Sequence, residues 1–252
     1  RDNYYACHFV GRALYNDSIA QYSLAKVYLT KSAIKLNDSD DQYDLAFLSP
    51  EDKEATEWLE MAANNNPSKY SLKVADLFRN GIKGGMKPDS SRAGKYYKEA
   101  INRNVGTSDD FLRIGHYFLK GDGVSISKDT AYDCFKKGAD QGNPDGAALV
   151  CIMYENGEIS GYSFPEKYYI QAANARRDYS SHFCWNLAVH YLRNAGDTSV
   201  YDYNRAADYF EKAGTPEGRE NAAKIRKAVR EYEERQREIE RQRQQAQNND
   251  DN

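Results

Sequence analysis

Histidine is the residue type in this sequence most suited to acid–base or metal chemistry, and its four copies do not occur in a catalytic or metal-binding spacing. They are His8, His116, His182 and His190. None belongs to an H-E-x-x-H segment, in which two histidines one helical turn apart hold zinc. His182 and His190 are eight residues apart and would share one side of a helix, but no carboxylate accompanies them there. We therefore expect polar surface histidines.

The four cysteines are also scattered. Cys7, Cys134, Cys151 and Cys184 form no C-x-x-C pair and have no regular paired spacing. This distribution favours neither a zinc site nor a disulfide framework. Each is expected to be a small, buried apolar residue.

An acidic run from Asp38 to Asp44 has oxygen-bearing side chains at alternate positions, as a calcium loop does. Such a loop needs glycine at its sixth position and a bidentate glutamate at its twelfth. Tyr43 and Ser49 occupy those positions. We therefore predict a solvated acidic loop, part of an insertion over residues 31–52, and no metal.

Other functions are disfavoured by what the sequence lacks. It contains no G-x-x-x-x-G-K-[ST], no G-x-G-x-x-G after a strand and no G-x-S-x-G. The net charge of -3 gives no basic field for nucleic acid or anionic membranes. No apolar run approaches the roughly 20 residues that span a bilayer. We predict a non-enzyme without cofactors, nucleic-acid binding or direct membrane insertion, and small-molecule ligands are not expected.

The elements that would position these side chains repeat along the chain. Five segments read apolar, small, two variable, aromatic, and they begin at Leu24, Val74, Ile114, Val150 and Leu187. The apolar residue and the aromatic share one helical face, and the small residue lets a neighbouring helix approach. We call the helices predicted over these segments the A helices.

A second pattern alternates with the first. A small residue precedes two bulky ones by three and four positions, and further small residues follow. These segments begin at Ala6, Ala55, Ala93, Ala131 and Ala206, and a further copy has proline at the first position. We call the corresponding predicted helices the B helices.

The spacing of both patterns indicates a solenoid. Successive A segments lie 50, 40, 36 and 37 residues apart, from Leu24 to Val74, Ile114, Val150 and Leu187. A helix pair at such intervals is one unit of a stacked repeat array. The sequence therefore predicts an all-α fold of about five antiparallel helix pairs.

The best-preserved copy resembles a known family. From Ile114 to Val124 it reads Ile-Gly-His-Tyr-Phe-Leu-Lys-Gly-Asp-Gly-Val, and it closes in Gln141-Gly142-Asn143. This is similar to the Sel-1-like repeat, a tetratricopeptide-type motif, and the resemblance covers about residues 4–214. Gly121 and Gly123 are expected to end a helix with positive φ. The resemblance implies a right-handed α-solenoid.

This organisation divides the chain into two predicted segments. Residues 1–214 are predicted to be the repeat array, starting within a repeat, so that the chain looks like a fragment. Residues 215–252 are predicted to be a capping helix, with an apolar stripe of Ile225, Val229 and Tyr232, that runs into a charged Glu/Arg/Gln tail. Compartment and oligomeric state stay open.

The resemblance also implies a binding surface. In similar repeats the A helices line a concave face that holds a protein or peptide segment. Four positions of each A helix match its ligand-facing positions, and nine of these residues are the expected contacts: Tyr22, Lys26, Asp76, Arg79, His116, Lys120, Glu155, Trp185 and Arg193.

We therefore expect a non-catalytic protein–protein interaction scaffold or adaptor. The alternative is a structural repeat module of a larger protein, which positions a catalytic or membrane domain, as a quality-control ubiquitin-ligase adaptor does. An enzyme with an unrecognised site is the third hypothesis.

Overall fold

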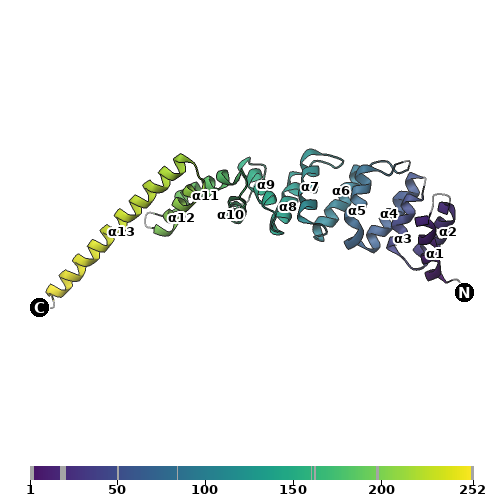
Figure 1. The fold of residues 1–252 in the computed structure, drawn as a ribbon, viewed down its shortest axis with the longest axis horizontal. Helices are drawn as coiled ribbons and strands as arrows, with labels where there is room; N and C mark the ends of the chain where they lie inside the picture. The colour runs from purple at the N-terminus through teal and green to yellow at the C-terminus, as the bar shows by residue number, and fades with distance from the viewer. Residues whose placement is uncertain are drawn as a thin grey trace. The chain divides into compact units, whose positions relative to one another are not determined.

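The computed structural model describes residues 3–17, 21–49, 51–83, 85–159, 161, 163–196 and 199–250. Every regular element within these ranges is an α-helix (Figure 1). The helices are α1 (Tyr4–Asp17), α2 (Tyr22–Lys35), α3 (Ser39–Phe47), α4 (Asp52–Asn65), α5 (Pro67–Asn80), α6 (Ser90–Asn102), α7 (Ser108–Lys120), α8 (Lys128–Asp140), α9 (Pro144–Glu155), α10 (Glu166–Ala173), α11 (Ser180–Asn194), α12 (Val200–Lys212) and α13 (Pro216–Asp250).

The helices form two compact units, Arg1–Asn143 and Pro144–Asn252. Each unit is built from consecutive helices that pack together. The pairs are α1/α2, α3/α4, α5/α6 and α7/α8 in the first unit and α9/α10 and α11/α12 in the second (Figure 1). The all-α repeat architecture predicted from the sequence is confirmed, and this order is compatible with an array of about five pairs.

Local sequence signals set the helix boundaries. Thr107 begins α7 in a capping box, in which its side chain accepts from the backbone N–H of Asp110 and the Asp110 carboxylate accepts from Thr107 N–H. Gly121 ends the same helix at a φ of 74°, and Gly123 follows at 68°. The left-handed conformation expected of both glycines is confirmed.

The A pattern describes the packing of α5, α7, α9 and α11 correctly. In α5, for example, Val74, Ala75 and Phe78 are fully buried. The small position of α7 is Gly115, where a Cβ atom would lie 2.5 Å from Phe135 Cε1 of α8. A glycine at this site therefore lets the two helices of the pair approach closely.

The predicted acidic loop is wrong, because part of the expected insertion is helix α3. Asp38 is the N-cap, and its side chain accepts from the backbone N–H groups of Asp40 and Asp41. Asp41, Gln42, Leu45 and Ala46 are buried on one face of α3, and the helix packs against α4. The run of acidic residues concealed this helical spacing of buried residues.

The two repeat patterns were also assigned wrongly in α1 and α2. Because α3 is the partner of α4, α1 and α2 form a pair of their own. Leu24 is 49% exposed and Phe9 is 69% exposed, although both patterns place these residues inside. The buried residues of α2 are instead Ala25, Leu29, Ser32 and Ala33.

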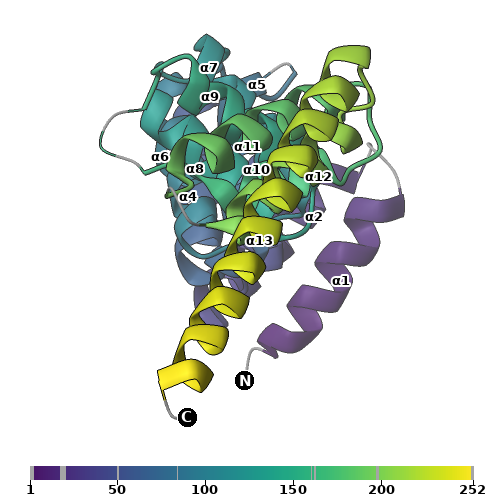
Figure 2. The same cartoon turned by 90° about the vertical axis from the view of Figure 1, so that its left-hand side faces the viewer.

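The last helix packs on the second unit and then continues into solvent. Ala222 of α13 is buried with Phe210 of α12 and Ala188 of α11, and Ile225 packs against this cluster. Residues 233–245 are all exposed. Figure 2 shows α13, in yellow, beginning beside α12 and extending beyond it. Among the described residues, no helix is long and apolar enough to cross a bilayer.

Candidate functional site

Asp76 joins three helices in the first unit. It lies on α5, and its Oδ1 accepts hydrogen bonds from Tyr97 Oη of α6 at 2.5 Å and from Arg113 Nη1 of α7 at 2.8 Å. Tyr97 is fully buried, and burial is the main cause of its raised pKa, with the hydrogen bond to Asp76 adding to it. Asp76 therefore fixes Arg113 at a half-exposed position on the next A helix.

Arg79 makes a second link from α5 to α7. Its guanidinium carbon lies 3.7 Å from the ring centroid of Tyr117, a cation–π geometry. Its Nε donates to the carbonyl oxygen of Asp122 at 3.1 Å, and its Nη2 donates to the Asp122 carboxylate. The predicted residues Asp76 and Arg79 thus belong to one ordered polar surface on α5 and α7.

Glu155 makes the corresponding contacts in the second unit, although it lies about one helical turn later in its A helix than Asp76 does. It lies on α9 and accepts from Tyr169 Oη of α10 at 2.7 Å and from Asn186 Nδ2 of α11 at 2.6 Å. His182 Nε2 of α11 lies 2.8 Å from the other carboxylate oxygen. His182 therefore does have a carboxylate neighbour, which the sequence does not reveal because it comes from a different helix.

Two predicted residues lie on α2, at a shallow hollow. Tyr22 is 36% exposed, and Lys26 Nζ forms a 2.7 Å ion pair with Glu54 of α4. Both side chains line the hollow, together with Phe47 and Ile82. Lys26 consequently links the first helix pair to the second.

The other predicted residues differ in exposure. His116 packs edge-on against Phe135 at 5.2 Å between ring centroids, and burial, followed by the charge of Lys120, lowers its pKa. Lys120 and Arg193 are exposed at the ends of α7 and α11. Trp185 packs edge-on against Phe210 of α12 at 4.9 Å between ring centroids, so part of its ring belongs to the core of the second unit.

The cysteines do not join this surface. All four are free thiols, and Cys134, Cys151 and Cys184 are buried as expected, whereas Cys7 is half-buried. Burial raises the pKa of the Cys134 thiol to about 12. A thiol with so high a pKa is a poor nucleophile near neutral pH.

Several residues of this surface were not identified from the sequence as functional. Tyr97 and Tyr169 were assigned only to the buried face of B helices, and Arg113 was not singled out. The hydroxyl of a core tyrosine can reach the next helix, and a repeat pattern that scores only apolar character does not record this.

Family comparison agrees with the geometry. A model of the Sel1 repeat matches residues 42–67, 71–105, 112–143 and 181–215, just over half of the chain. The chain belongs to the Sel1 repeat family. The first matched Sel1 repeat begins inside α3, which agrees with the pairing of α3 and α4. Sel1 repeats commonly mediate protein–protein interaction and are typically non-catalytic.

Solved structures of Sel1-type proteins are similar to this chain at low identity. A protective antigen of uropathogenic Escherichia coli with an SLR fold matches at 20% identity and a TM-score of 0.40, over 79% of this chain and 42% of that one. A Sel1 repeat protein from Oxalobacter formigenes matches at 20% identity and a TM-score of 0.38, over 85% of this chain and 86% of that one. This chain thus spans less than half of the length of the first protein.

Proposed function

We propose that this Sel1 repeat protein is a non-catalytic scaffold that holds a segment of a partner protein on its A helices. The observation that carries the proposal is the polar junction between successive A helices in each unit. Asp76 holds Arg113 in place, and Glu155 holds Asn186 and His182. Side chains that are already ordered lose less conformational entropy when a partner binds.

The chemistry of the surface suggests the kind of partner. The proposed contact residues on the A helices are Asp76, Arg79, His116 and Lys120 in the first unit and Glu155, Trp185 and Arg193 in the second. Tyr22 and Lys26, also expected from the sequence, lie on α2, which is the second helix of its pair, and are left out of this surface. Tyrosine, tryptophan and arginine often dominate interface energy. Because acidic and basic side chains are interspersed, a chain segment with charges of both signs fits better than a uniformly acidic one.

The proposal can be tested with charge reversals at exposed positions. Lys120→Glu changes the surface of the first unit and Arg193→Glu that of the second. Lys53→Glu on α4 and Lys224→Glu on α13 are matched controls, because these lysine side chains are 89% and 68% exposed and lie on other helices. Capture from source extract identifies a partner, and binding of its purified segment is then measured for each variant.

We expect Lys120→Glu or Arg193→Glu to weaken binding of the segment at least tenfold, and both controls to bind as the original chain does. Equal binding by all four variants would place the contact elsewhere and refute the proposal. Circular dichroism confirms that each variant keeps its helical content.

A structural module within a larger protein is the second candidate function, and exposed apolar side chains on α1 and α2 favour it. Phe9, Val27 and Ile34 are 69%, 52% and 56% exposed, and exposed apolar patches often mark contacts with folded neighbours. Phe9→Ser with Val27→Ser would abolish such a contact. The same double variant would leave segment binding on the A helices unchanged.

A further inference from the structure

Four aspartates gather at the start of α3, and two of them have strong cationic partners. Arg12 Nη1 lies 3.4 Å from Asp40 and its Nη2 lies 3.3 Å from Asp44. Lys69 Nζ lies 2.7 Å from Asp40. Burial alone would raise the pKa of Asp40, but the hydrogen bonds from Lys69 and Tyr70 and the charges of Lys69 and Arg12 outweigh it and leave that pKa below its usual value. Arg12 and Lys69 are therefore engaged with Asp40 and Asp44.

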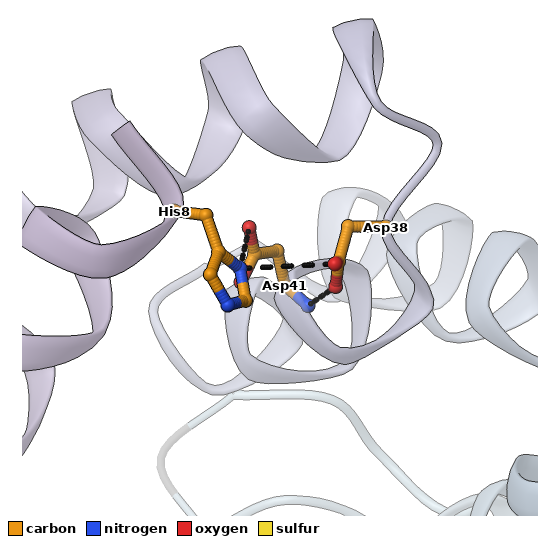
Figure 3. Close-up of side chains that lie close together, drawn as sticks. All are labelled: His8, Asp38 and Asp41. Atoms are coloured by element: carbon orange, nitrogen blue, oxygen red, sulfur yellow. Dashed lines mark hydrogen bonds and ion pairs between the residues drawn. The ribbon is translucent and has the colours of Figure 1, made fainter. Parts of the chain in front are cut away.

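Asp38 and Asp41 share a different neighbour, the imidazole of His8 on α1. His8 Nδ1 lies 3.0 Å from Asp41 Oδ1 and 3.7 Å from Asp38 Oδ2 (Figure 3). Within the described part of the chain, no lysine or arginine forms an ion pair with either carboxylate. Two carboxylates thus face a single imidazole, and a divalent cation would balance their charge.

Each carboxylate is already oriented by a donor on its second oxygen. Asp38 Oδ1 accepts from the backbone N–H groups of Asp40 and Asp41, at 2.9 and 3.0 Å. Asp41 Oδ2 accepts from the hydroxyl of Ser32 on α2. Asp38 thus has one oxygen held by backbone donors and the other facing His8, whereas both oxygens of Asp41 lie 3.0 Å from His8 Nδ1. In metal sites, outer hydrogen bonds of this kind orient the ligands.

We propose that His8, Asp38 and Asp41 bind a divalent transition-metal ion, and that zinc fits best. Zinc lies about 2.0–2.2 Å from nitrogen and carboxylate ligands, so ligand atoms of a tetrahedral site are roughly 3.3–3.5 Å apart. The 3.0 and 3.7 Å distances lie on either side of that range. An imidazole ligand disfavours calcium and magnesium, which take oxygen ligands.

Burial leaves one side of the site open. The side chain of Asp41 is fully buried, whereas His8 is 21% and Asp38 30% exposed. Zinc can enter from the exposed side and keep a water molecule as its fourth ligand. Binding to Nδ1 requires the neutral imidazole, so any proton on that nitrogen is released to solvent.

The bound ion would connect two helix pairs. His8 comes from α1, and Asp38 and Asp41 come from the N-terminal end of α3 (Figure 3). Zinc would therefore stabilise the packing of α1 and α2 on α3 and α4. This role is structural and is independent of partner binding on the A helices.

The test is a titration of zinc chloride into chelator-treated protein, followed by calorimetry and by thermal unfolding. Asp38→Asn removes a carboxylate ligand but keeps an N-cap residue of nearly equal strength, so the fold is preserved. His8→Gln removes the imidazole. His182→Gln is the matched control, since His182 also lies 2.8 Å from a carboxylate but has only one acidic partner. Cys7→Ser checks the neighbouring thiol.

We expect one zinc ion per chain and a higher melting temperature with zinc. Both effects should disappear in Asp38→Asn and His8→Gln and persist in His182→Gln and Cys7→Ser. Ser32→Ala should weaken zinc binding about 10- to 100-fold, because the hydroxyl only orients Asp41.

Absence of saturable zinc binding would overturn the proposal, and His8 would then be a hydrogen-bond partner of Asp41 only. Zinc binding that survives in both Asp38→Asn and His8→Gln would also overturn it. Magnesium or calcium binding as tight as zinc binding would contradict the assigned role of the imidazole.

Discussion

The junction at Asp76 in the first unit and the junction at Glu155 in the second use the same design with different partners. In both, a buried tyrosine of the B helix donates to a carboxylate on the A helix, Tyr97 to Asp76 and Tyr169 to Glu155. The next A helix supplies Arg113 in the first unit, whereas it supplies Asn186 and His182 in the second. The hydrogen bond from tyrosine to carboxylate is thus shared by both junctions, and the charge of the residue from the next A helix differs.

The largest loss of stability is expected at the small position of the A-helix pattern, where the two units have different residues. Gly115 of α7 corresponds to Cys151 of α9 in the repeat pattern, and only the glycine leaves room for Phe135. Gly115→Cys should lower the free energy of unfolding by about 1–3 kcal/mol, through overpacking. Urea denaturation measures this change. An unchanged midpoint would show that Phe135 can move aside at little cost.

The next prediction concerns Asp76 and Glu155, the carboxylates that accept the tyrosine hydrogen bond in the two junctions. Asp76→Ala and Glu155→Ala each leave a buried tyrosine hydroxyl without its acceptor, which costs about 1–3 kcal/mol. Tyr97 and Tyr169 are 0% and 1% exposed. The two alanine variants should therefore lose similar amounts of unfolding free energy, as measured by urea denaturation. Asp76→Asn and Glu155→Gln are the controls, since the amide oxygen can still accept. A loss in only one unit would show that the two junctions are not equivalent.

Alkaline pH should weaken both junctions. Burial, followed by the hydrogen bond to the carboxylate, raises the pKa of Tyr97 and of Tyr169 above the ordinary value of 10.0. Between pH 10 and the raised pKa, the unfolded chain has lost protons that the folded chain retains, so stability falls as pH rises.

Tyr97→Phe and Tyr169→Phe should each make the decrease in melting temperature above pH 10 less steep. Melting curves from pH 8 to 11 measure this. An unchanged slope in both variants would show that these tyrosines titrate alike in the folded and unfolded chain.

The smallest loss of stability is expected for the residue that the next A helix contributes to each junction. Arg113 is 36% exposed, so Arg113→Gln should cost no more than about 1 kcal/mol, and the cost should shrink as salt is added. Asn186→Ala should show no such salt dependence, because its bond to Glu155 does not involve a cation. Unfolding at low and high salt tests the pair. Equal salt dependence would show that the two junctions do not differ in charge.

Much of the repeat architecture could be predicted from the sequence because its packing is periodic. The i, i+4 pairs of an apolar residue and an aromatic identified α5, α7, α9 and α11. Helix α3 could not be recognised by that pattern, since its buried face includes Asp41 and Gln42, whose polar groups are satisfied by Ser32, His8 and backbone. Missing α3 reversed the assignment of α1 and α2.

The candidate site was predictable only in part. Helix phase singled out Asp76, Arg79 and Glu155, because residues at the same offset in an A helix lie on the same side of it, and the structure shows these three residues in polar contact with the next A helix or the loop after it. The hydrogen bonds of Glu155 to Tyr169 and Asn186 could not be predicted, since they join residues 14 and 31 positions apart in sequence. Such pairs depend on how neighbouring helices pack, which the pattern within one helix does not specify.

Hydrogen exchange of the chain with and without its captured partner segment tests the central claim most directly. Binding on the A helices predicts slower exchange in α5 and α7 of the first unit and in α9 and α11 of the second, with α4, α6, α8 and α12 unchanged. Slower exchange confined to α13, or to the exposed face of α1 and α2, would contradict the claim.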